Sequence, residues 1–430
     1  MTISVIGHGY VGLVTACVFA DFGNHVWVIG HTKEKIARLK NGDPIIYEPG
    51  LKELLQKNLT SKRIFFTLDY EKAISESDIV FITVGTPPKT TGEADLTAVI
   101  EVAQNIGKNL KNKFTVVSCK STVPVGTNHK LEDIINKHKP KQVDFAIASC
   151  PEFLREGTAI SDTINSDRIV IGSDNKEAVE KLVKLHKPIS GKRVITNLAS
   201  AEMIKYASNV FLANKISFAN LISFYCEKTG ADVGEVLTGV GIDARIGKQF
   251  LNPGIGYGGS CLPKDVKAFL DIGKRLSVDT QLLLAIENIN LKAQEIFLEK
   301  IIKYSPGKKV AIWGLSFKPN TDDIRFAPSV FIIKNLLKNG FQLNVYDQEA
   351  TNNIKKIFAN QITYSQDLYQ TVNNADALVI ITEWNEFRQI DLNKIKGLMS
   401  NPTIFDGRNI YDPSDLKKLG FKYYSVGRPT

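Results

Sequence analysis

Cysteines are few in this chain of 430 residues, and long apolar runs are missing from it. The five cysteines are an odd number without a CxxC pair or a close Cys/His cluster, which argues against a disulfide framework and against a zinc site. No apolar run approaches the roughly 18 residues that a membrane-spanning helix needs, and the first residues lead into an expected strand without the features of a signal peptide. We therefore expect a cytoplasmic protein that binds neither a membrane nor a metal.

Charge of either sign is moderate in this sequence. Charged residues make up 23% of the chain and hydrophobic residues 43%, which excludes a disordered protein. The 54 Lys and Arg residues exceed the 45 Asp and Glu residues and give a net charge of +9. This surplus favours anionic ligands but gives no reason to expect nucleic acid. At roughly 150 residues per domain, the length corresponds to more than one domain.

Short apolar runs bounded by turn residues alternate with helical stretches, a pattern that is typical of α/β folds with parallel sheets. Residues 200–226 form one long stretch without Gly or Pro, and its apolar spacing predicts a helix. We therefore predict two Rossmann-like doubly wound domains joined by a long central helix. The expected strands are 3–6, 26–29, 79–84, 114–118, 145–149 and 169–171 before this helix, and 310–314, 343–346, 377–382 and 404–406 after it.

A glycine-rich turn follows the first expected strand and reads Gly7-His8-Gly9-Tyr10-Val11-Gly12 before an apolar helical stretch. In a turn of this kind the first glycine permits a tight bend, the second lets the backbone approach a pyrophosphate, and the third allows the helix to pack closely on the strand. The first N–H groups of the helix then face the phosphates. The sequence therefore predicts a dinucleotide-binding turn.

The end of the second expected strand departs from that fingerprint. An Asp or Glu is expected there to hydrogen-bond the adenosine ribose of NAD, but the sequence reads Val28-Ile29-Gly30-His31-Thr32-Lys33. Two interpretations stay open. Thr32 and Lys33 accommodate the 2′-phosphate of NADP, or NAD is bound more weakly with no gain for NADP.

A second glycine-rich segment, residues 252–265, contains Cys261 with Lys264 and Asp265 close behind it. A neighbouring cation makes a thiol more reactive, which favours a nucleophile. A thiol without a chemical role remains the alternative. Lys205 and Asn209 share one face of the long helix, because they lie four residues apart.

Seven segments occur in the order found in one family of enzymes: GHGYVG, VGTPP, STVPVGT, PEFLREG, EMIKYASN, RIGKQFLNPGIGYGGSCLPKD and FKPNTDDIR. With these segments the chain resembles the UDP-glucose 6-dehydrogenase family within the nucleotide-sugar dehydrogenases, over nearly its whole length. The resemblance implies an N-terminal dinucleotide-binding domain at 1–199, a central helical dimerisation region with the cysteine loop at 200–300, and a C-terminal nucleotide-sugar-binding domain at 301–430.

The resemblance also implies the reaction, a two-step oxidation of UDP-glucose to UDP-glucuronate with NAD, or with NADP because of Gly30. Cys261 would form a thiohemiacetal and then a thioester. Lys205 and Asn209 would stabilise the oxyanion. The further catalytic residues implied are Asp265, Glu152 and Thr122.

The same resemblance implies two sets of binding residues. Those near the cofactor are Gly7, Gly9, Tyr10, Val11, Gly12, Gly30, Lys35, Thr86, Thr122, Glu156, Lys264 and Arg325. Those near the substrate are Glu152, Phe153, Leu154, Arg155, Lys205, Asn209, Arg245, Phe250, Leu251, Asn252, Pro253, Gly254, Gly258, Phe317, Lys318 and Arg408. Arg245 would come from the neighbouring subunit of a homodimer. Departures from the family pattern are His8, Gly30, Cys150 and Leu262.

Three other functions compete with this interpretation. A GDP-mannose 6-dehydrogenase shares the GSCLPKD segment, whereas RIGKQFLNPGIGYGG favours UDP-glucose. A β-hydroxyacid dehydrogenase also pairs a Rossmann domain with a long helix bearing Lys and Asn, but it has no need of Cys261. A regulatory protein that binds nucleotide sugars without turnover would not need the complete set of catalytic candidates.

Overall fold

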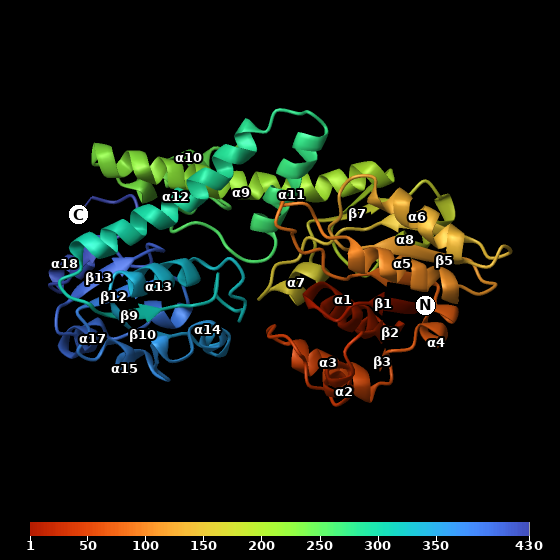
Figure 1. Ribbon diagram of the computed structural model, residues 1–430, viewed down its shortest axis with the longest axis horizontal. Coiled ribbons are helices and arrows are strands. Elements are labelled where there is room, and N and C mark those ends of the chain that lie inside the picture. The colour runs from red at the N-terminus through yellow and green to blue at the C-terminus, as the bar shows by residue number, and fades with distance from the viewer. Residues whose placement is uncertain (430) are drawn as a thin grey trace. The chain divides into compact units, whose positions relative to one another are not determined.

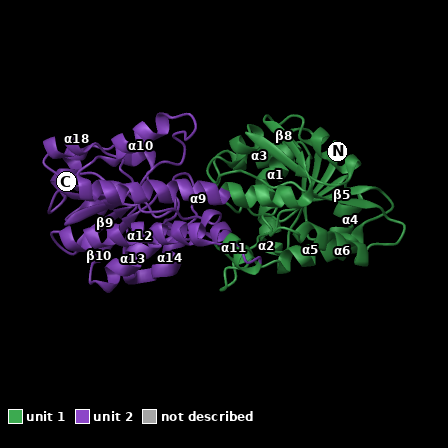
Figure 2. Cartoon of the chain, turned by 90° about the horizontal axis from the view of Figure 1, so that it is seen from above, with its two compact units in different colours: residues 1–208, 267–275 green, residues 209–266, 276–430 purple. Residues whose placement is uncertain are grey.

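The computed structural model describes residues 1–429 and divides into two compact units, shown in different colours in Figure 2. Unit 1 comprises residues 1–208 and 267–275. Unit 2 comprises residues 209–266 and the chain from Leu276 onward. The predicted three-part division at 199/200 and 300/301 stays a prediction.

Unit 1 is built on an eight-stranded sheet with the order β3-β2-β1-β4-β5-β6-β7-β8. All neighbouring strands are parallel except β6 and β7, which meet antiparallel at the single pair Ser149 and Gly172. The predicted doubly wound sheet is confirmed, with this antiparallel join as the difference from an all-parallel one. The strands are β1 (Thr2–Ile6), β2 (His25–Ile29), β3 (Ile64–Thr67), β4 (Ile79–Ile82), β5 (Thr115–Cys119), β6 (Phe145–Ser149), β7 (Arg168–Gly172) and β8 (Lys192–Thr196).

Unit 2 contains a six-stranded sheet with the order β11-β10-β9-β12-β13-β14, and every pairing in it is parallel. Its strand order repeats the doubly wound pattern in which the chain starts near the middle of the sheet and winds outward in both directions. The second Rossmann-like domain is therefore confirmed. The strands are β9 (Lys309–Trp313), β10 (Gln342–Tyr346), β11 (Thr363–Tyr364), β12 (Ala377–Ile380), β13 (Thr403–Asp406) and β14 (Lys422–Tyr424).

The strands that the sequence did not predict are β3, β8, β11 and β14, all of them at sheet edges. An edge strand is covered on fewer sides than a central one, so it does not need a continuous apolar run. β8 illustrates this, because it reads Lys-Arg-Val-Ile-Thr and has no buried residue.

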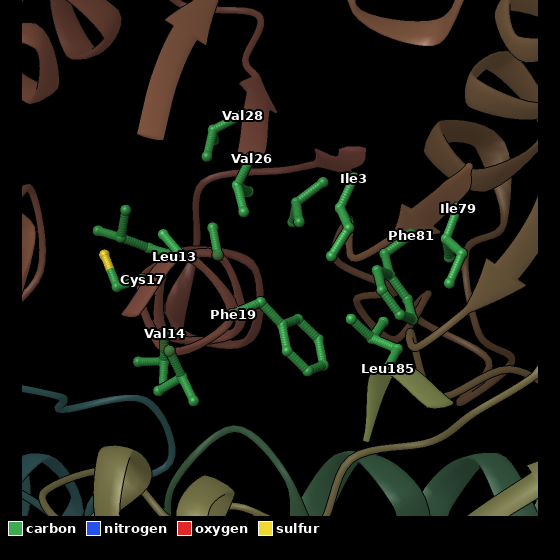
Figure 3. Close-up of a cluster of buried hydrophobic side chains, with 14 of the residues drawn as sticks. Ile3, Leu13, Val14, Cys17, Phe19, Val26, Val28, Ile79, Phe81 and Leu185 are labelled. Atoms are coloured by element: carbon green, nitrogen blue, oxygen red, sulfur yellow. The ribbon is translucent and has the colours of Figure 1, made fainter. Parts of the chain in front are cut away.

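Helix α1 (Tyr10–Asp21) carries the largest share of the unit 1 core. Its residues 12–20 are all buried, as expected of a helix that is apolar on every side. Figure 3 shows Phe19 of α1 pointing toward Phe81 of β4. The ring of Phe19 stacks on that of Phe81 with 5.7 Å between the centroids. Packing of this helix therefore fixes the glycine turn that precedes it.

Helix α9 (Leu198–Thr229) is the long helix that the sequence predicts, extended by a few residues at each end (Figure 1). It ends before Gly230, whose positive φ of 79° is usual for a residue that closes a helix. Within residues 1–429 no helix is both long and apolar enough to cross a membrane.

The remaining helices of the first half are α2 (Lys33–Lys40), α3 (Leu51–Thr60), α4 (Tyr70–Ser75), α5 (Thr97–Asn109), α6 (Thr127–His138), α7 (Ala159–Ile164) and α8 (Lys176–Leu185). After α9 follow α10 (Val233–Ile242), α11 (Leu262–Arg275), α12 (Gln281–Tyr304), α13 (Pro328–Lys338), α14 (Thr351–Phe358), the short 3-10 helix η1 (Ala359–Gln361), α15 (Leu368–Val372), α16 (Asn385–Arg388), α17 (Leu392–Leu398) and α18 (Pro413–Lys418).

Candidate active site

The glycine turn joins β1 to α1 where the winding of the unit 1 sheet reverses. β1 lies between β2 and β4, and ligands of open α/β sheets bind outside the carboxyl ends of the strands at such a point. A Cβ atom on Gly12 would lie 2.2 Å from the carbonyl oxygen of Gly7, so only glycine fits there. A Cβ atom on Gly9 would meet nothing within 4 Å, which leaves its backbone open to a ligand. These features fit the pyrophosphate of a dinucleotide.

Loops after two further strands come to the same sheet edge. The Thr83 hydroxyl donates a hydrogen bond to the carbonyl of Ile6 at 2.8 Å, which ties the end of β4 to the end of β1. The Thr86 hydroxyl donates to the carbonyl of Thr122 at 2.8 Å, which ties the loops after β4 and β5 together. The predicted cofactor residues Thr86 and Thr122 are thus neighbours.

Two buried glutamates that the sequence analysis missed hold the loops after β5 and β6 in shape. Glu48 accepts hydrogen bonds from the backbone N–H groups of Gly157 at 2.6 Å and Ala159 at 2.7 Å, beside the predicted residue Glu156. Glu202 accepts from the N–H of Gly126 at 2.6 Å and from that of Asn128 at 2.8 Å. Their partners lie more than 70 residues away in sequence, so local spacing gave no signal.

Glu152 and Lys205 form a buried ion pair in unit 1. The Lys205 Nζ lies 3.1 Å from Glu152 Oε1, and the two side chains are 5% and 9% exposed. Lys205 also lies 5.2 Å from the centre of the Phe153 ring, and Glu152 Oε2 accepts from the Leu154 N–H at 2.6 Å. The predicted residues Glu152, Phe153, Leu154 and Lys205 are therefore together. Arg155 instead makes a surface ion pair with Asp162 at 2.7 Å.

Cys261 occupies the position just before helix α11, where its carbonyl accepts the first helical hydrogen bond from the N–H of Asp265 at 2.9 Å. Lys264 and Asp265 therefore lie in the first helical turn. The positive end of a helix stabilises a thiolate next to it. Cys261 is exposed, whereas the other four cysteines are buried. Burial raises the pKa of Cys17 and of Cys119 to about 12, which makes them inert thiols.

Asp265 is the buried partner of two predicted site residues in unit 2. Its Oδ2 accepts a hydrogen bond from Asn209 Nδ2 at 2.6 Å, and its Oδ1 pairs with the Lys264 ammonium. Asp265 is 1% exposed and Asn209 is 6% exposed. Asn209 lies one helical turn after Lys205 on α9, so both side chains project from the same face of that helix.

The glycines before Cys261 are required by close backbone contacts. Gly259 has a φ of +81°, and its N–H donates to the carbonyl of Arg325 at 2.8 Å. A Cβ atom on Gly259 would lie 2.7 Å from the Phe317 ring. Asn290 fixes the loop further, because its amide oxygen accepts from the Tyr257 N–H at 2.7 Å and its amide nitrogen donates to the Tyr257 carbonyl at 3.1 Å. Asn290 is another residue that the sequence analysis missed.

The predicted substrate residues of unit 2 gather around the same segment. Arg408 Nη1 donates to the carbonyl of Gly256 at 3.2 Å, and Arg408 Nε lies 3.2 Å from a Glu383 oxygen. A Cβ atom on Gly254 would lie 3.2 Å from Arg408 Nη1, so the backbone before the cysteine passes directly along the guanidinium. Leu251 is buried, and Lys318 Nζ lies 5.6 Å from the Phe317 ring.

Two predicted arginines are held by neighbouring acids instead. Arg245 pairs with Asp243 at 2.6 Å on an exposed segment, and Arg325 pairs with Asp323 at 2.7 Å. Of the predicted catalytic residues, Thr122, Glu152 and Lys205 belong to unit 1, and Asn209, Cys261 and Asp265 belong to unit 2.

The two folds and their side chains define a dinucleotide-dependent oxidoreductase with an exposed cysteine. Comparison with protein families makes this specific. Residues 1–190 match the NAD binding domain of the UDP-glucose/GDP-mannose dehydrogenase family, residues 199–292 its central domain, and residues 311–413 its UDP binding domain. The chain belongs to this family.

Individual relatives extend over the full chain. The UDP-glucose 6-dehydrogenase TuaD of Bacillus subtilis is 45% identical, over 99% of this chain and 93% of that protein. The UDP-glucose 6-dehydrogenase of Pseudomonas aeruginosa is 42% identical, over 100% of this chain and 98% of that protein. A UDP-glucose dehydrogenase structure from Pyrobaculum islandicum has a TM-score of 0.93 at 34% identity, over 99% of this chain and 98% of that chain.

These comparisons confirm the predicted family, the fold class and an NAD-dependent oxidoreductase that takes a nucleotide sugar. They favour UDP-glucose over the alternative substrate. A GDP-mannose dehydrogenase structure from Pseudomonas aeruginosa, 30% identical over 99% of each chain, has a TM-score of only 0.57.

Proposed function

We propose that this protein oxidises the C6 hydroxymethyl group of UDP-glucose to a carboxylate and releases UDP-glucuronate. The observation that carries the proposal is Cys261, the exposed cysteine among five, at the start of α11 in a chain whose relatives include UDP-glucose 6-dehydrogenases. Oxidation of an alcohol to an acid removes four electrons, so it takes two oxidation steps.

NAD, when bound, accepts a hydride in each of the two oxidations. This chain's part is to hold it. The N–H groups at the start of α1 would hold the pyrophosphate, and Gly9 leaves the backbone accessible to it. Thr86 and Thr122 lie at the same sheet edge. Tyr10, Val11, Glu156, Lys264 and Arg325 are proposed as further cofactor neighbours from the family resemblance.

Cys261 is the proposed nucleophile of the second oxidation. Its thiolate adds to the aldehyde carbon and forms a C–S bond, and the former carbonyl oxygen takes up a proton. Loss of hydride and of that proton then converts the thiohemiacetal to a thioester. Water attacks the thioester, the C–S bond breaks, and the thiolate and the carboxylic acid are released. The helix N-terminus stabilises the thiolate before the attack and after the release.

Polar neighbours are proposed to handle charge and protons in these steps. The Lys205 ammonium and the Asn209 amide supply donors for the oxygen that becomes negative. Asp265 orients Asn209 through the 2.6 Å hydrogen bond and accepts a proton from the attacking water. Glu152 holds Lys205 in place through their ion pair and is the second acid–base candidate. Thr122 is proposed to organise water.

Substrate recognition is proposed for the segment around Arg408. The UDP diphosphate is an anion, which a guanidinium binds in a bidentate manner. The remaining proposed substrate residues are Phe250, Leu251, Asn252, Pro253, Gly254, Gly258, Phe317 and Lys318. The experiment that tests the substrate is a comparison of kcat/KM for UDP-glucose and GDP-mannose. A clearly higher value for GDP-mannose would contradict the proposal.

The proposed assembly is a homodimer formed through α9. Phe211, Phe218 and Tyr225 lie seven residues apart on one face of that helix, and their side chains are 63%, 42% and 64% exposed. An apolar stripe of this kind is usually covered by a partner. Arg245 is proposed to reach the neighbouring subunit's substrate. Light scattering of the protein and of Phe211→Ser/Phe218→Ser tests this, since a monomeric native protein would contradict it. A cytoplasmic location stays a prediction.

A further inference from the structure

We propose that the chain carries a binding site for the 2′-phosphate of NADP at the end of β2, formed by His8, His31 and Lys35. The enzyme would then bind NADP more tightly than NAD. The inference rests on the proposed function for the dinucleotide fold itself, and it concerns only the adenosine ribose. The sequence favoured Thr32 and Lys33 for this phosphate, and the family resemblance placed Lys35 near the cofactor. The two histidines are added from the structure.

The first observation is the surroundings of Gly30, the residue directly after β2 where an acidic side chain would bind the ribose hydroxyls of NAD. A Cβ atom on Gly30 would lie 2.6 Å from Cδ2 of His8 and 2.6 Å from Cδ1 of Ile36. The imidazole of His8 thus fills the space in which an aspartate side chain would begin. The two departures from the family pattern, His8 and Gly30, form one structural change.

The second observation is an unsatisfied nitrogen at this position. His8 is only 6% exposed, and its Nε2 has no hydrogen-bond partner among residues 1–429. Nε2 is bonded to Cδ2, the atom that lies against Gly30. A buried nitrogen without a partner is costly, and when the imidazole is protonated Nε2 becomes a donor for an acceptor that a ligand supplies. A phosphate oxygen is such an acceptor.

The third observation is the positive charge around His8. The His31 ring lies 5.1 Å from the His8 ring, centre to centre. Burial, and then the neighbouring His31 and Lys35, lower the pKa of His8. A lowered pKa keeps the His8 imidazole neutral near pH 7, and the negative charge of a phosphate beside it would favour its protonated form.

The start of α2 adds donors to the same place. Thr32 is the residue before the first turn of this helix, and its side chain makes no capping hydrogen bond. The first N–H groups of α2 therefore have no side-chain cap from Thr32, and helix N-termini of this kind bind phosphate. The first N–H groups of α2, the charge of Lys35 and the unpaired Nε2 of His8 therefore belong to the region where the carboxylate of the fingerprint is missing.

Direct binding measurements separate this proposal from turnover. ADP-ribose and 2′-phospho-ADP-ribose differ only in the phosphate and cannot be reduced, so isothermal titration of the full chain with each isolates its effect. We expect the phosphorylated ligand to bind at least about tenfold more tightly. The value of kcat/KM should likewise be higher for NADP than for NAD. Equal or tighter binding of ADP-ribose would overturn the proposal and leave the proposed function intact. Binding of neither ligand would contradict the dinucleotide site itself, and the proposal with it.

Variants assign the effect to residues. Lys35→Ala and His31→Ala should each lower the preference for the phosphorylated ligand by about tenfold. Lys40→Ala removes the same charge at the far end of α2 and serves as the control, with no change expected. An unchanged preference in both Lys35→Ala and His31→Ala would overturn the assignment.

Introducing an acidic residue at position 30 needs two substitutions, because an aspartate there would overlap with His8. Gly30→Asp alone must displace the imidazole and is expected to lose stability. His8→Ala/Gly30→Asp makes room for the carboxylate. This double variant should bind ADP-ribose more tightly than 2′-phospho-ADP-ribose, since the acid accepts from the ribose hydroxyls and repels the phosphate. Retention of the original preference in a folded double variant would overturn the proposal.

Discussion

Cys261 differs from the four other cysteines in what surrounds its sulfur. Cys17, Cys119, Cys150 and Cys226 are buried, and burial raises the pKa of each thiol. Cys261 is exposed at the positive end of a 14-residue helix. The sequence alone left its role open between a nucleophile and a thiol without a function. The helix boundary at Leu262 supports the proposed nucleophile, because it places the sulfur at the start of a helix.

Replacement of this sulfur should separate the two oxidations. In Cys261→Ser we expect steady-state formation of the acid to fall on the order of 10³-fold or more, because a serine hydroxyl is not ionised near neutral pH and forms no thioester. Rapid-quench analysis should find the sugar nucleotide oxidised only to the aldehyde, either free or bound to the protein. Cys226→Ser, a buried cysteine outside the site, is the control with normal turnover. Normal turnover in Cys261→Ser would remove the nucleophile from the account.

The ion pair of Lys205 and Glu152 is expected to serve catalysis as well as packing. Lys205→Ala should lower kcat by about 10² to 10³, since it removes an oxyanion donor, with a smaller effect on the KM for UDP-glucose. Lys300→Ala breaks another partly buried pair, with Glu227 at 2.6 Å, and should lower stability without changing kcat. Equal effects of the two substitutions on kcat would show that Lys205 acts only through folding.

The strand–turn–helix of β1 and α1 was predictable because its parts are contiguous in sequence. Glycine spacing, the preceding apolar strand and the following apolar helix all point to the same structure. The segment around Cys261 was less predictable. It reads as one loop in sequence, yet α11 begins at Leu262 with a proline in its first turn, where proline is tolerated.

Two glycines of the turn between β1 and α1 should respond differently to the same added methyl group. Gly12→Ala places a Cβ atom 2.2 Å from a backbone oxygen, so we expect a lower melting temperature together with lost cofactor binding. Gly9→Ala meets nothing within 4 Å, so the fold should be unaffected while cofactor affinity falls on the order of tenfold or more. Thermal unfolding and titration with dinucleotide measure the two effects. Unimpaired dinucleotide binding in Gly9→Ala would contradict the placement of the pyrophosphate.

Both doubly wound sheets followed from the alternation of strands and helices along the chain. The edge strands and the antiparallel join of β6 and β7 did not, because few residues define them. The side chains that hold the site loops through hydrogen bonds, Glu48, Glu202 and Asn290, were missed because their partners are distant in sequence. The contact of His8 with Gly30 also required the structure, since only side-chain positions reveal that one residue fills the space of another.

His186 links the stability of the molecule to pH. Burial, and then the charge of Lys120, lowers the pKa of His186 from its ordinary value of 6.5 to about 3. As pH falls below 6.5 the unfolded chain takes up a proton at this residue and the folded chain does not. Its contribution to stability is therefore complete above pH 6.5 and is lost toward pH 3, with a slope of up to about 1.4 kcal/mol per pH unit.

Urea unfolding across this pH range tests the assignment. His186→Leu should unfold with a shallower acid dependence than the native protein, whatever its stability at neutral pH. His129→Leu removes a histidine whose side chain is 56% exposed and should leave the dependence unchanged. An identical slope in His186→Leu and the native protein would contradict the account.

The stoichiometry of the reaction decides whether the protein carries out a four-electron oxidation through a thioester on Cys261. Purified protein is given limiting UDP-glucose and an excess of NAD or NADP, whichever it binds more tightly, and reduced cofactor is counted against sugar consumed. We predict two molecules of reduced cofactor per UDP-glucuronate and no free aldehyde, because the aldehyde carbon is captured by the thiol. One molecule of reduced cofactor per sugar, with an aldehyde accumulating in solution, would contradict it.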